Sequence, residues 1–255
     1  MILTIDVGNS DIVTVLFDKD KNILNYDRRE TIKKNKLEDY ENYLKDIKKK
    51  FNIDKVNYVV SCVVPIVYDN LKQALKKHMN KGFFVDYKSY EGISKLLDPP
   101  EEIGSDLVAA SVEAIERYSQ PTIIVDMGTA SKIIVVNDNT IIGVAILLGV
   151  KKTRNAIVKS IPHLPKVKLD FPKNIVGQNT IESIQSGIMF STTASINGYS
   201  DLIEKYFNQK VKKIITGGMS SLFVKELDDY IYEENLVSEG LFTLYKINEK
   251  KGMLS

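Results

Sequence analysis

Apolar and polar positions divide the chain into short strand-like segments and longer helical ones. Three segments near the N-terminus have the length and alternation of strands: MILTID (1–6), IVTVLF (12–17) and ILNYDRRE (23–30). Three later segments repeat this arrangement: TIIVD (122–126), KIIVV (132–136) and TIIGVAI (140–146). Short polar turns separate the members of each group. Both groups therefore predict a meander of three antiparallel strands.

Helical spacing follows each meander. The segment 36–51 carries Tyr40, Leu44 and Ile47 among charged residues, which predicts an amphipathic helix. A strand, a helix and a strand are expected next, at 55–64, 66–79 and 82–86. After the second meander we expect a long helix from near Asn179 to Phe207, a strand at 211–218 and a helix at 220–230. This order predicts a duplicated α/β fold of two lobes, 1–115 and 116–255, with a cleft between them.

Composition and charge narrow the classes of function. The chain has 255 residues, and its 35 Lys and Arg against 33 Asp and Glu give a net charge of +2, which argues against a nucleic-acid partner. The longest apolar run, 141–150, is too short to cross a bilayer, so we expect a cytoplasmic protein without a membrane partner. Cys62 lies in an apolar run, which favours a buried thiol. His78 and His163 are isolated and indicate no metal cluster.

An Asp-x-Gly sequence ends the first strand of each meander. Asp6 and Gly8 recur as Asp126 and Gly128, and the same alignment places 12–17 on 132–137 and residue 18 on residue 138. Glycine there permits positive φ and a close approach of the backbone to phosphate, and aspartate offers a hard oxygen to Mg²⁺ or a monovalent cation. A plain hairpin turn would explain one copy. Two matched copies and a later TGG (216–218) favour a phosphate site.

Seven segments give the chain a resemblance to a known family: DVGNS (6–10), SCVVP (61–65), PEEIGSD (100–106), DMGTA (126–130), IVGQNTIESIQSGI (175–188), TGG (216–218) and NLVSEGL (235–241). Their order resembles the acetate kinase, sugar kinase, Hsp70 and actin superfamily, and within it the type III pantothenate kinases. The resemblance covers nearly the whole chain. It implies two actin-like lobes that close over ATP and phosphorylate pantothenate in coenzyme A biosynthesis.

The resemblance also implies roles for individual residues. Asp6 would hold Mg²⁺ through water, Asp126 would bind the monovalent cation, potassium or ammonium, and Asp106 would be the catalytic base for the pantothenate hydroxyl. The other residues implied to bind ATP are Val7, Gly8, Asn9, Ser10, Asp11, Ile12, Val13 and Thr129. Those implied to line the pantothenate pocket are Gly104, Ser105, Leu107 and Thr180.

Several positions depart from the family pattern. Leu107 stands where the family has the arginine that holds the acceptor carboxylate, Leu97 where it has a tyrosine and Ala110 where it has an asparagine. Lys132 and Ile134 replace a threonine and an aspartate beside the second turn. Lys132 is either a surface lysine at the strand edge or a cation that enters the phosphate site and replaces potassium. Losing the arginine alone weakens acceptor binding by about 10-fold to 100-fold.

Three functions remain open at this point. The chain is an active pantothenate kinase with a degenerate acceptor pocket, a non-catalytic subunit that pairs with an intact paralogue, or a related kinase that acts on another small alcohol. We expect a dimer, either of two identical chains or with a paralogous kinase chain. Its surface would include segment 183–203, which mixes small and apolar residues over more helix than one lobe can cover.

Overall fold

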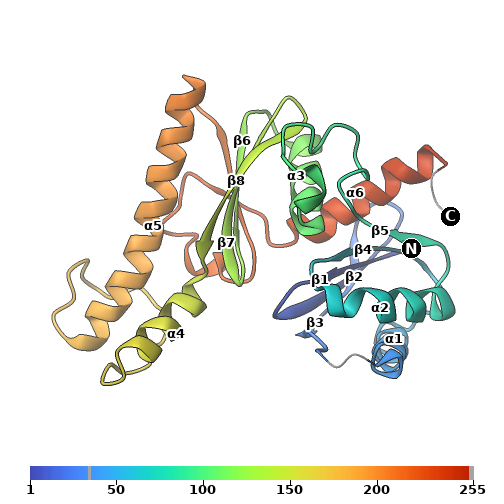
Figure 1. Cartoon of the computed structure of the whole chain (residues 1–255), viewed down its shortest axis with the longest axis horizontal. Coiled ribbons are helices and arrows are strands. Elements are labelled where there is room, and N and C mark those ends of the chain that lie inside the picture. Colours follow the sequence, from blue (N-terminus) through green and yellow to red (C-terminus); the bar gives the residue numbers. More distant parts are fainter. Residues whose placement is uncertain (34–35, 253–255) are drawn as a thin grey trace. The chain divides into compact units, whose positions relative to one another are not determined.

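The computed structural model of the chain describes residues 1–33 and 36–252, which form two compact units (Figure 1). The first unit combines Met1–Arg117 with Leu236–Ser255, and the second is Tyr118–Asn235. The predicted lobes were two continuous segments that met at residues 115 and 116. The structure differs because the last helix, α6 (Leu236–Lys250), packs against α3 (Ser105–Arg117) and against strands of the first unit.

The first unit is a five-stranded sheet with helices packed against it. Its strands, in the order β3-β2-β1-β4-β5, are β3 (Ile23–Glu30), β2 (Asp11–Phe17), β1 (Ile2–Val7), β4 (Asn57–Cys62) and β5 (Gly82–Phe84). Its other helices are α1 (Leu37–Phe51), α2 (Pro65–His78) and the short 3₁₀ helix η1 (Pro100–Glu102). The first three strands form the predicted antiparallel meander. β4 and β5 extend the sheet in parallel, as the intervening helices allow.

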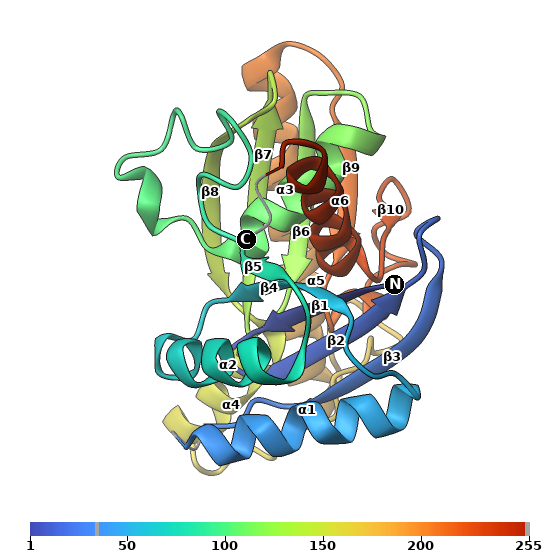
Figure 2. The same cartoon turned by 90° about the vertical axis from the view of Figure 1, so that its right-hand side faces the viewer.

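Alternation along β1 separates the two faces of this sheet. Leu3, Ile5 and Val7 are fully buried in a core that they share with apolar residues of α1 and α2, two helices that run along the same side of the sheet in Figure 2. The opposite face meets α6, where Asn57 of β4 donates a 2.7 Å hydrogen bond to the Tyr245 hydroxyl. Even-numbered positions of β1 point to this second face, and Asp6 is one of them.

The second unit repeats the sheet of the first. Its strands, in the order β8-β7-β6-β9-β10, are β8 (Thr140–Leu148), β7 (Ala130–Asn137), β6 (Thr122–Met127), β9 (Lys212–Thr216) and β10 (Ile231–Tyr232). Its helices are α4 (Val150–Ser160), α5 (Thr180–Phe207) and the 3₁₀ helix η2 (Ser220–Leu222). Three antiparallel strands are again followed by two parallel ones. The predicted duplicated α/β fold is confirmed.

The long helix of the second unit follows its sequence signals. The side chain of Asn179 accepts a 3.0 Å hydrogen bond from the Glu182 amide at the N-terminus of α5, and Asn208 ends the helix in the left-handed conformation. Ile188, Met189 and Ile196 of this helix are buried in the core of the second unit. The described residues contain no helix that is both long and apolar enough to cross a membrane.

Two details of the second unit differ from prediction. Residues 220–230 were expected to form a helix, but only η2 forms, followed by turns. Phe223, Leu227 and Tyr230 are buried at helical spacing, yet bonds such as Tyr230 N–H to the Leu227 carbonyl close tight turns between them. Helix α4 was not predicted, since only one of its residues, Val150, is buried.

Strand register also corrects the alignment of the two repeats. In the first meander Asp6 lies opposite Val13, and in the second Asp126 lies opposite Lys132. The second turn is therefore one residue shorter than the first. Lys132 corresponds to Val13, so from this point on the repeats align one residue away from the sequence-based match.

Candidate functional site

A polar edge of the first sheet begins at Asp6, near the end of β1. The parallel register places Ser61 of β4 beside Asp6, and the Val63 amide donates a 3.1 Å hydrogen bond to the Val7 carbonyl beyond the strand. Asp6 is half-buried, whereas Ser61 is fully buried. The carboxyl ends of two parallel strands thus bring a carboxylate and a hydroxyl together at one edge, where α/β folds commonly bind ligands.

The start of α3 is attached to the same edge. The Ser105 hydroxyl lies 3.0 Å from the Ser61 hydroxyl and accepts a 2.9 Å hydrogen bond from the Cys62 amide. These contacts hold the first turn of α3, and with it Asp106, at the end of β4. The two predicted carboxylates, Asp6 and Asp106, therefore belong to one constellation within the first unit.

Asp106 is largely buried, with 9% of its surface exposed. Its Oδ1 accepts a 2.9 Å hydrogen bond from the Leu107 amide. The carboxylate lies in the first turn of α3, where the partial positive charge of a helix N-terminus favours an anion. A Cβ on Gly104 would come within 2.5 Å of Asp106 Oδ1, so residue 104 must be small for the carboxylate to lie here.

The turn between β1 and β2 is closed by its own backbone. The Gly8 amide donates to the Asp11 carbonyl at 2.9 Å. Thr31 holds the turn from outside, because its hydroxyl donates to the Gly8 carbonyl at 2.6 Å and its amide to the Ser10 carbonyl at 2.9 Å. Asn9 and Ser10 at the tip are exposed. The turn therefore presents polar groups on a fixed backbone.

This geometry corrects one expectation about the paired glycines. Gly8 and Gly128 were expected to let their turns adopt positive φ, but among the described residues the glycines with positive φ are Gly92, Gly217 and Gly252. The Gly128 amide is also used within its own turn, at 3.2 Å from the Ala130 carbonyl. Neither glycine amide is thus available to cradle a phosphate while its turn is closed.

The remaining residues of segment 7–13 divide by burial. Val7 and Ile12 are fully buried, so their side chains belong to the core and only their backbone can face a ligand. Val13 is half-buried. The carboxylate of Asp11 forms a 2.7 Å ion pair with Arg28 of β3. These four residues support the turn, and its tip residues are better placed to contact a nucleotide.

The second unit has an equivalent polar edge with a different charge pattern. Asp126, near the end of β6, forms a 3.1 Å ion pair with Lys132, which lies directly opposite on β7. Gly217, after β9, adopts a φ of +95°, and a Cβ there would lie 2.5 Å from Asp126 Oδ1. The glycine of the TGG segment is therefore required beside this carboxylate.

Further groups surround the second turn. A Cβ on Gly149, which precedes α4, would lie 2.5 Å from the carbonyl oxygens of both Gly128 and Thr129. The N-terminus of α4 is thus in close contact with the turn. Thr129 is exposed at the tip of the turn, and Thr180 is exposed at the first position of α5. The predicted site residues fall into two groups, one in each unit.

The acceptor-side positions are more buried than their proposed role would suggest. Leu107 is 7% exposed and Ala110 1% exposed, both on α3, and Leu97 is half-buried. An arginine at position 107 would have to displace packed surface before it could reach a small molecule. The apolar character of Leu107 and Ala110 therefore fits the packing of α3.

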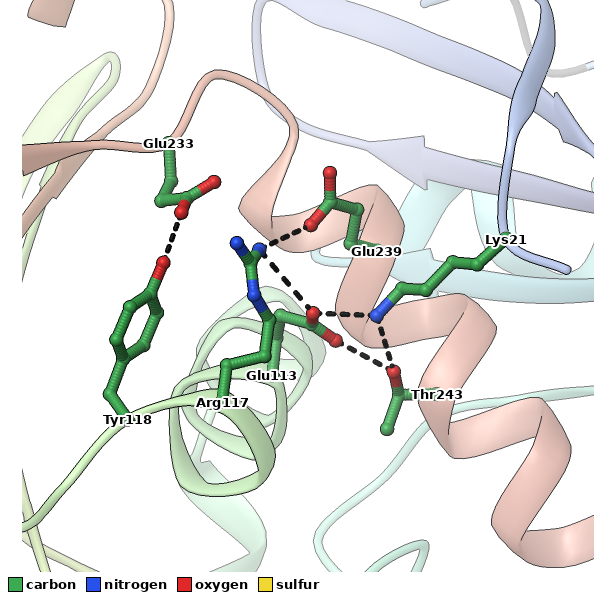
Figure 3. Close-up of polar contacts among 7 residues, drawn as sticks. All are labelled: Lys21, Glu113, Arg117, Tyr118, Glu233, Glu239 and Thr243. Carbon is green, nitrogen blue, oxygen red and sulfur yellow. Dashed lines mark hydrogen bonds and ion pairs between the residues drawn. The ribbon is translucent and has the colours of Figure 1, made fainter.

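Sequence reasoning missed a buried polar cluster on α3. Figure 3 shows Glu113 pointing toward α6, and its carboxylate accepts from Lys21 of the β2–β3 turn at 2.5 Å and from the Thr243 hydroxyl of α6 at 2.6 Å. At the end of α3, Arg117 forms a 2.7 Å ion pair with Glu239. The cluster joins α3, α6 and the β2–β3 turn. In the sequence its members look like ordinary polar residues of helices and a turn, which gives no signal of burial.

Two further residues of the site had only weak signals. Ser61 lies within a mainly apolar strand sequence, and Thr31 follows the third strand by a single residue. Their hydrogen bonds to Ser105 and to the Gly8 turn depend on tertiary placement.

Comparison with known proteins identifies a family for the chain. The family model for type III pantothenate kinase matches residues 2–202. A type III pantothenate kinase from Persephonella marina is 34% identical and aligns with 96% of this chain and 98% of its own length. One from Brevibacillus brevis is 30% identical over 98% of this chain and 100% of its own length.

Solved structures support the fold alone. A protein from Sinorhizobium meliloti described as a 2-dehydro-3-deoxygalactonokinase superposes with a TM-score of 0.62 at 10% identity, over 97% of this chain and 96% of its own. The activator of 2-hydroxyisocaproyl-CoA dehydratase from Clostridium difficile, solved with bound ADPNP, gives 0.56 at 12% identity, over 99% and 97%. The family match over most of the chain and the full-length relatives establish that the chain belongs to the type III pantothenate kinase family.

Proposed function

We propose that the chain binds ATP with Mg²⁺ and transfers the γ-phosphoryl group to the primary hydroxyl of pantothenate. The observation that carries this proposal is the contact between Ser61 and Ser105, which places Asp106 at the same sheet edge as Asp6. Phosphoryl transfer depends mainly on positioning and charge stabilisation. A metal-binding carboxylate and a base on one rigid edge suit both needs.

The residues of the first unit fit a magnesium nucleotide. Asp6 supplies the hard carboxylate oxygen that Mg²⁺ prefers, at the end of a buried strand. Asn9 and Ser10 offer exposed polar groups on a turn that Thr31 holds in place. When bound, the metal would neutralise phosphate charge. The protein contributes the fixed positions of the carboxylate and the turn.

Asp106 would act as the general base. Its carboxylate would take the proton as the pantothenate oxygen bonds to the γ-phosphorus and the bond from that phosphorus to the ADP oxygen breaks. The Ser105 contacts and the small residue at 104 fix the position of the carboxylate. A positioned base contributes about 10²- to 10⁴-fold in rate.

The pantothenate pocket would differ from that of the family. Leu107 takes the place of the carboxylate-binding arginine implied by the resemblance, and its side chain is packed in α3. The acceptor would then be bound about 10-fold to 100-fold more weakly than with a charged hydrogen bond. Thr180, exposed at the start of α5, remains a candidate contact.

The second unit favours a homodimer. Its exposed apolar residues include Leu202 at 64% and Tyr206 at 77% on α5, and Ile146 at 73% on β8. Large apolar side chains left exposed in this way are typical of protein interfaces. Light scattering at micromolar concentration should report a dimer and Leu202→Glu should weaken it, whereas a wild-type monomer would contradict the proposal.

One assay tests the kinase activity. ADP release with and without pantothenate would be measured for the wild type, for Asp106→Asn and for Asp20→Asn, which alters an exposed aspartate in the β2–β3 turn. We expect pantothenate-dependent turnover, an approximately 10²-fold or greater loss in Asp106→Asn and no loss in the control. Calorimetry should show that Asp106→Asn still binds Mg²⁺-ATP and that Asp6→Asn binds it more weakly.

The outcomes separate the functions considered. Absence of turnover with ample pantothenate and potassium, together with normal nucleotide binding, would refute the active kinase and favour a non-catalytic subunit. Turnover with another alcohol but not with pantothenate would refute pantothenate as the acceptor but not the kinase activity.

A further inference from the structure

The ion pair between Lys132 and Asp126 is set by the sheet itself. The two residues are direct partners in the β6–β7 register, so their side chains leave the same face of the sheet. Lys132 Nζ lies 3.1 Å from Asp126 Oδ2. The side chains are 20% and 13% exposed, and salt screens such a shielded pair less than a surface pair.

The surroundings leave this carboxylate little room for another cation. The backbone of Gly217 lies close to Asp126 Oδ1. A Cβ added at residue 217 would be 2.5 Å from that oxygen. The ammonium group of Lys132 occupies the other oxygen. A potassium ion on Asp126 would meet a like charge at contact distance. The residues present therefore do not fit the monovalent cation that the family resemblance implies.

We propose that Lys132 replaces the monovalent cation at the second turn, so that nucleotide binding by this chain is independent of potassium. The proposal rests on the ATP-binding function proposed above. The ammonium group neutralises Asp126 and adds a fixed positive charge beside the turn formed by Gly128 and Thr129. A lysine on a buried strand provides this charge without binding an ion from solution.

The first unit supplies the contrast. The position equivalent to Lys132 is Val13, opposite Asp6, so the first turn has an apolar residue where the second has a cation. A carboxylate opposite valine suits a hydrated divalent metal, and a carboxylate opposite lysine does not. The two similar turns thus have different charge, which assigns the metal to the first and the lysine to the second.

Two measurements test the proposal with the full chain. The first is calorimetric affinity for Mg²⁺-ADPNP in potassium chloride and in tetramethylammonium chloride at equal ionic strength. The second is the melting temperature in the same salts without nucleotide. Both are made on the wild type, Lys132→Thr, Lys132→Arg and Lys168→Thr. Lys168 is a matched control because its ion pair with Asp170 is on the surface, with the lysine 83% exposed.

In the wild type, Lys132→Arg and the control, we expect the same affinity and melting temperature in both salts. Lys132→Thr should bind the nucleotide about 10-fold more weakly without potassium, the loss of one charged contact, and potassium should restore binding and raise the melting temperature. A potassium-specific gain in the wild type would overturn the proposal, as would potassium-independent behaviour of Lys132→Thr. If no variant binds nucleotide, the ATP-binding function fails, and the melting temperatures alone decide the role of Lys132.

Discussion

Replacing Gly217 by alanine tests the tightest contact of the second unit. The residue has a φ of +95°, a conformation that costs an alanine about 1–2 kcal/mol. Its Cβ would also lie 2.6 Å from the Met127 nitrogen and 2.5 Å from Asp126 Oδ1. Backbone at Met127 cannot move aside as a flexible side chain can, and overpacking of this kind costs about 1–3 kcal/mol. We expect Gly217→Ala to lower the free energy of unfolding by about 2–5 kcal/mol.

Matched glycines separate the two contributions. Gly92 has a φ of +78° with only Lys95 Cδ, at 3.9 Å, near its Cβ position, so Gly92→Ala carries the backbone cost alone. Gly187, on α5, has open space at its Cβ, and Gly187→Ala should raise stability by about 0.5–1 kcal/mol. Urea unfolding of the three variants gives the comparison. If Gly217→Ala costs no more than Gly92→Ala, the close contact with Asp126 is not a constraint.

Two further predictions concern ionisable groups of the first unit. Burial would raise the pKa of Asp27, but hydrogen bonds from Arg29 and Lys50 outweigh it and hold that pKa below its usual value. This stabilisation is present above the unfolded pKa of about 4 and is lost as the pH falls through the folded pKa. Asp27→Asn should therefore be less stable at neutral pH, and its free energy of unfolding in urea should fall less steeply as the pH is lowered. An unchanged pH dependence would contradict this. Burial raises the pKa of the Cys62 thiol, so iodoacetamide should alkylate it more slowly at pH 8 than an exposed peptide thiol, and equal rates would contradict the structure.

The fold could be predicted where local pattern and tertiary structure agree. Alternation identified the strands of both meanders, and the asparagines at 179 and 208 mark the ends of α5. The apolar pattern gave a wrong prediction where burial sets the spacing of apolar residues without a helix. Apolar residues at 223, 227 and 230 fit a helix, but consecutive turns bury them equally well. The placement of α6 depends on a contact far apart in the sequence, where a Cβ on Gly240 would lie 1.9 Å from the Ala109 carbonyl oxygen.

The site was predicted as a set of residues but not as a geometry. The resemblance supplied both Asp6 and Asp106, whereas the serine pair that joins their elements depends on how α3 meets β4. Glycine was expected to permit positive φ at the two turns, yet each turn is closed by its own backbone hydrogen bond without positive φ at its glycine. Both roles considered for Lys132 were compatible with the sequence, and only the cross-strand register pairs it with Asp126.

The discontinuous first unit has a consequence for synthesis on the ribosome. Its sheet and α3 are made first, but α6, which packs on both, emerges only after the whole second unit. The second unit is a single continuous segment whose contacts are all encoded before α6 appears. Since domains fold as units during synthesis, the second unit can complete its core while the first still exposes the surface that awaits α6. A truncation before Leu236 would therefore damage the unit made first and spare the one made later.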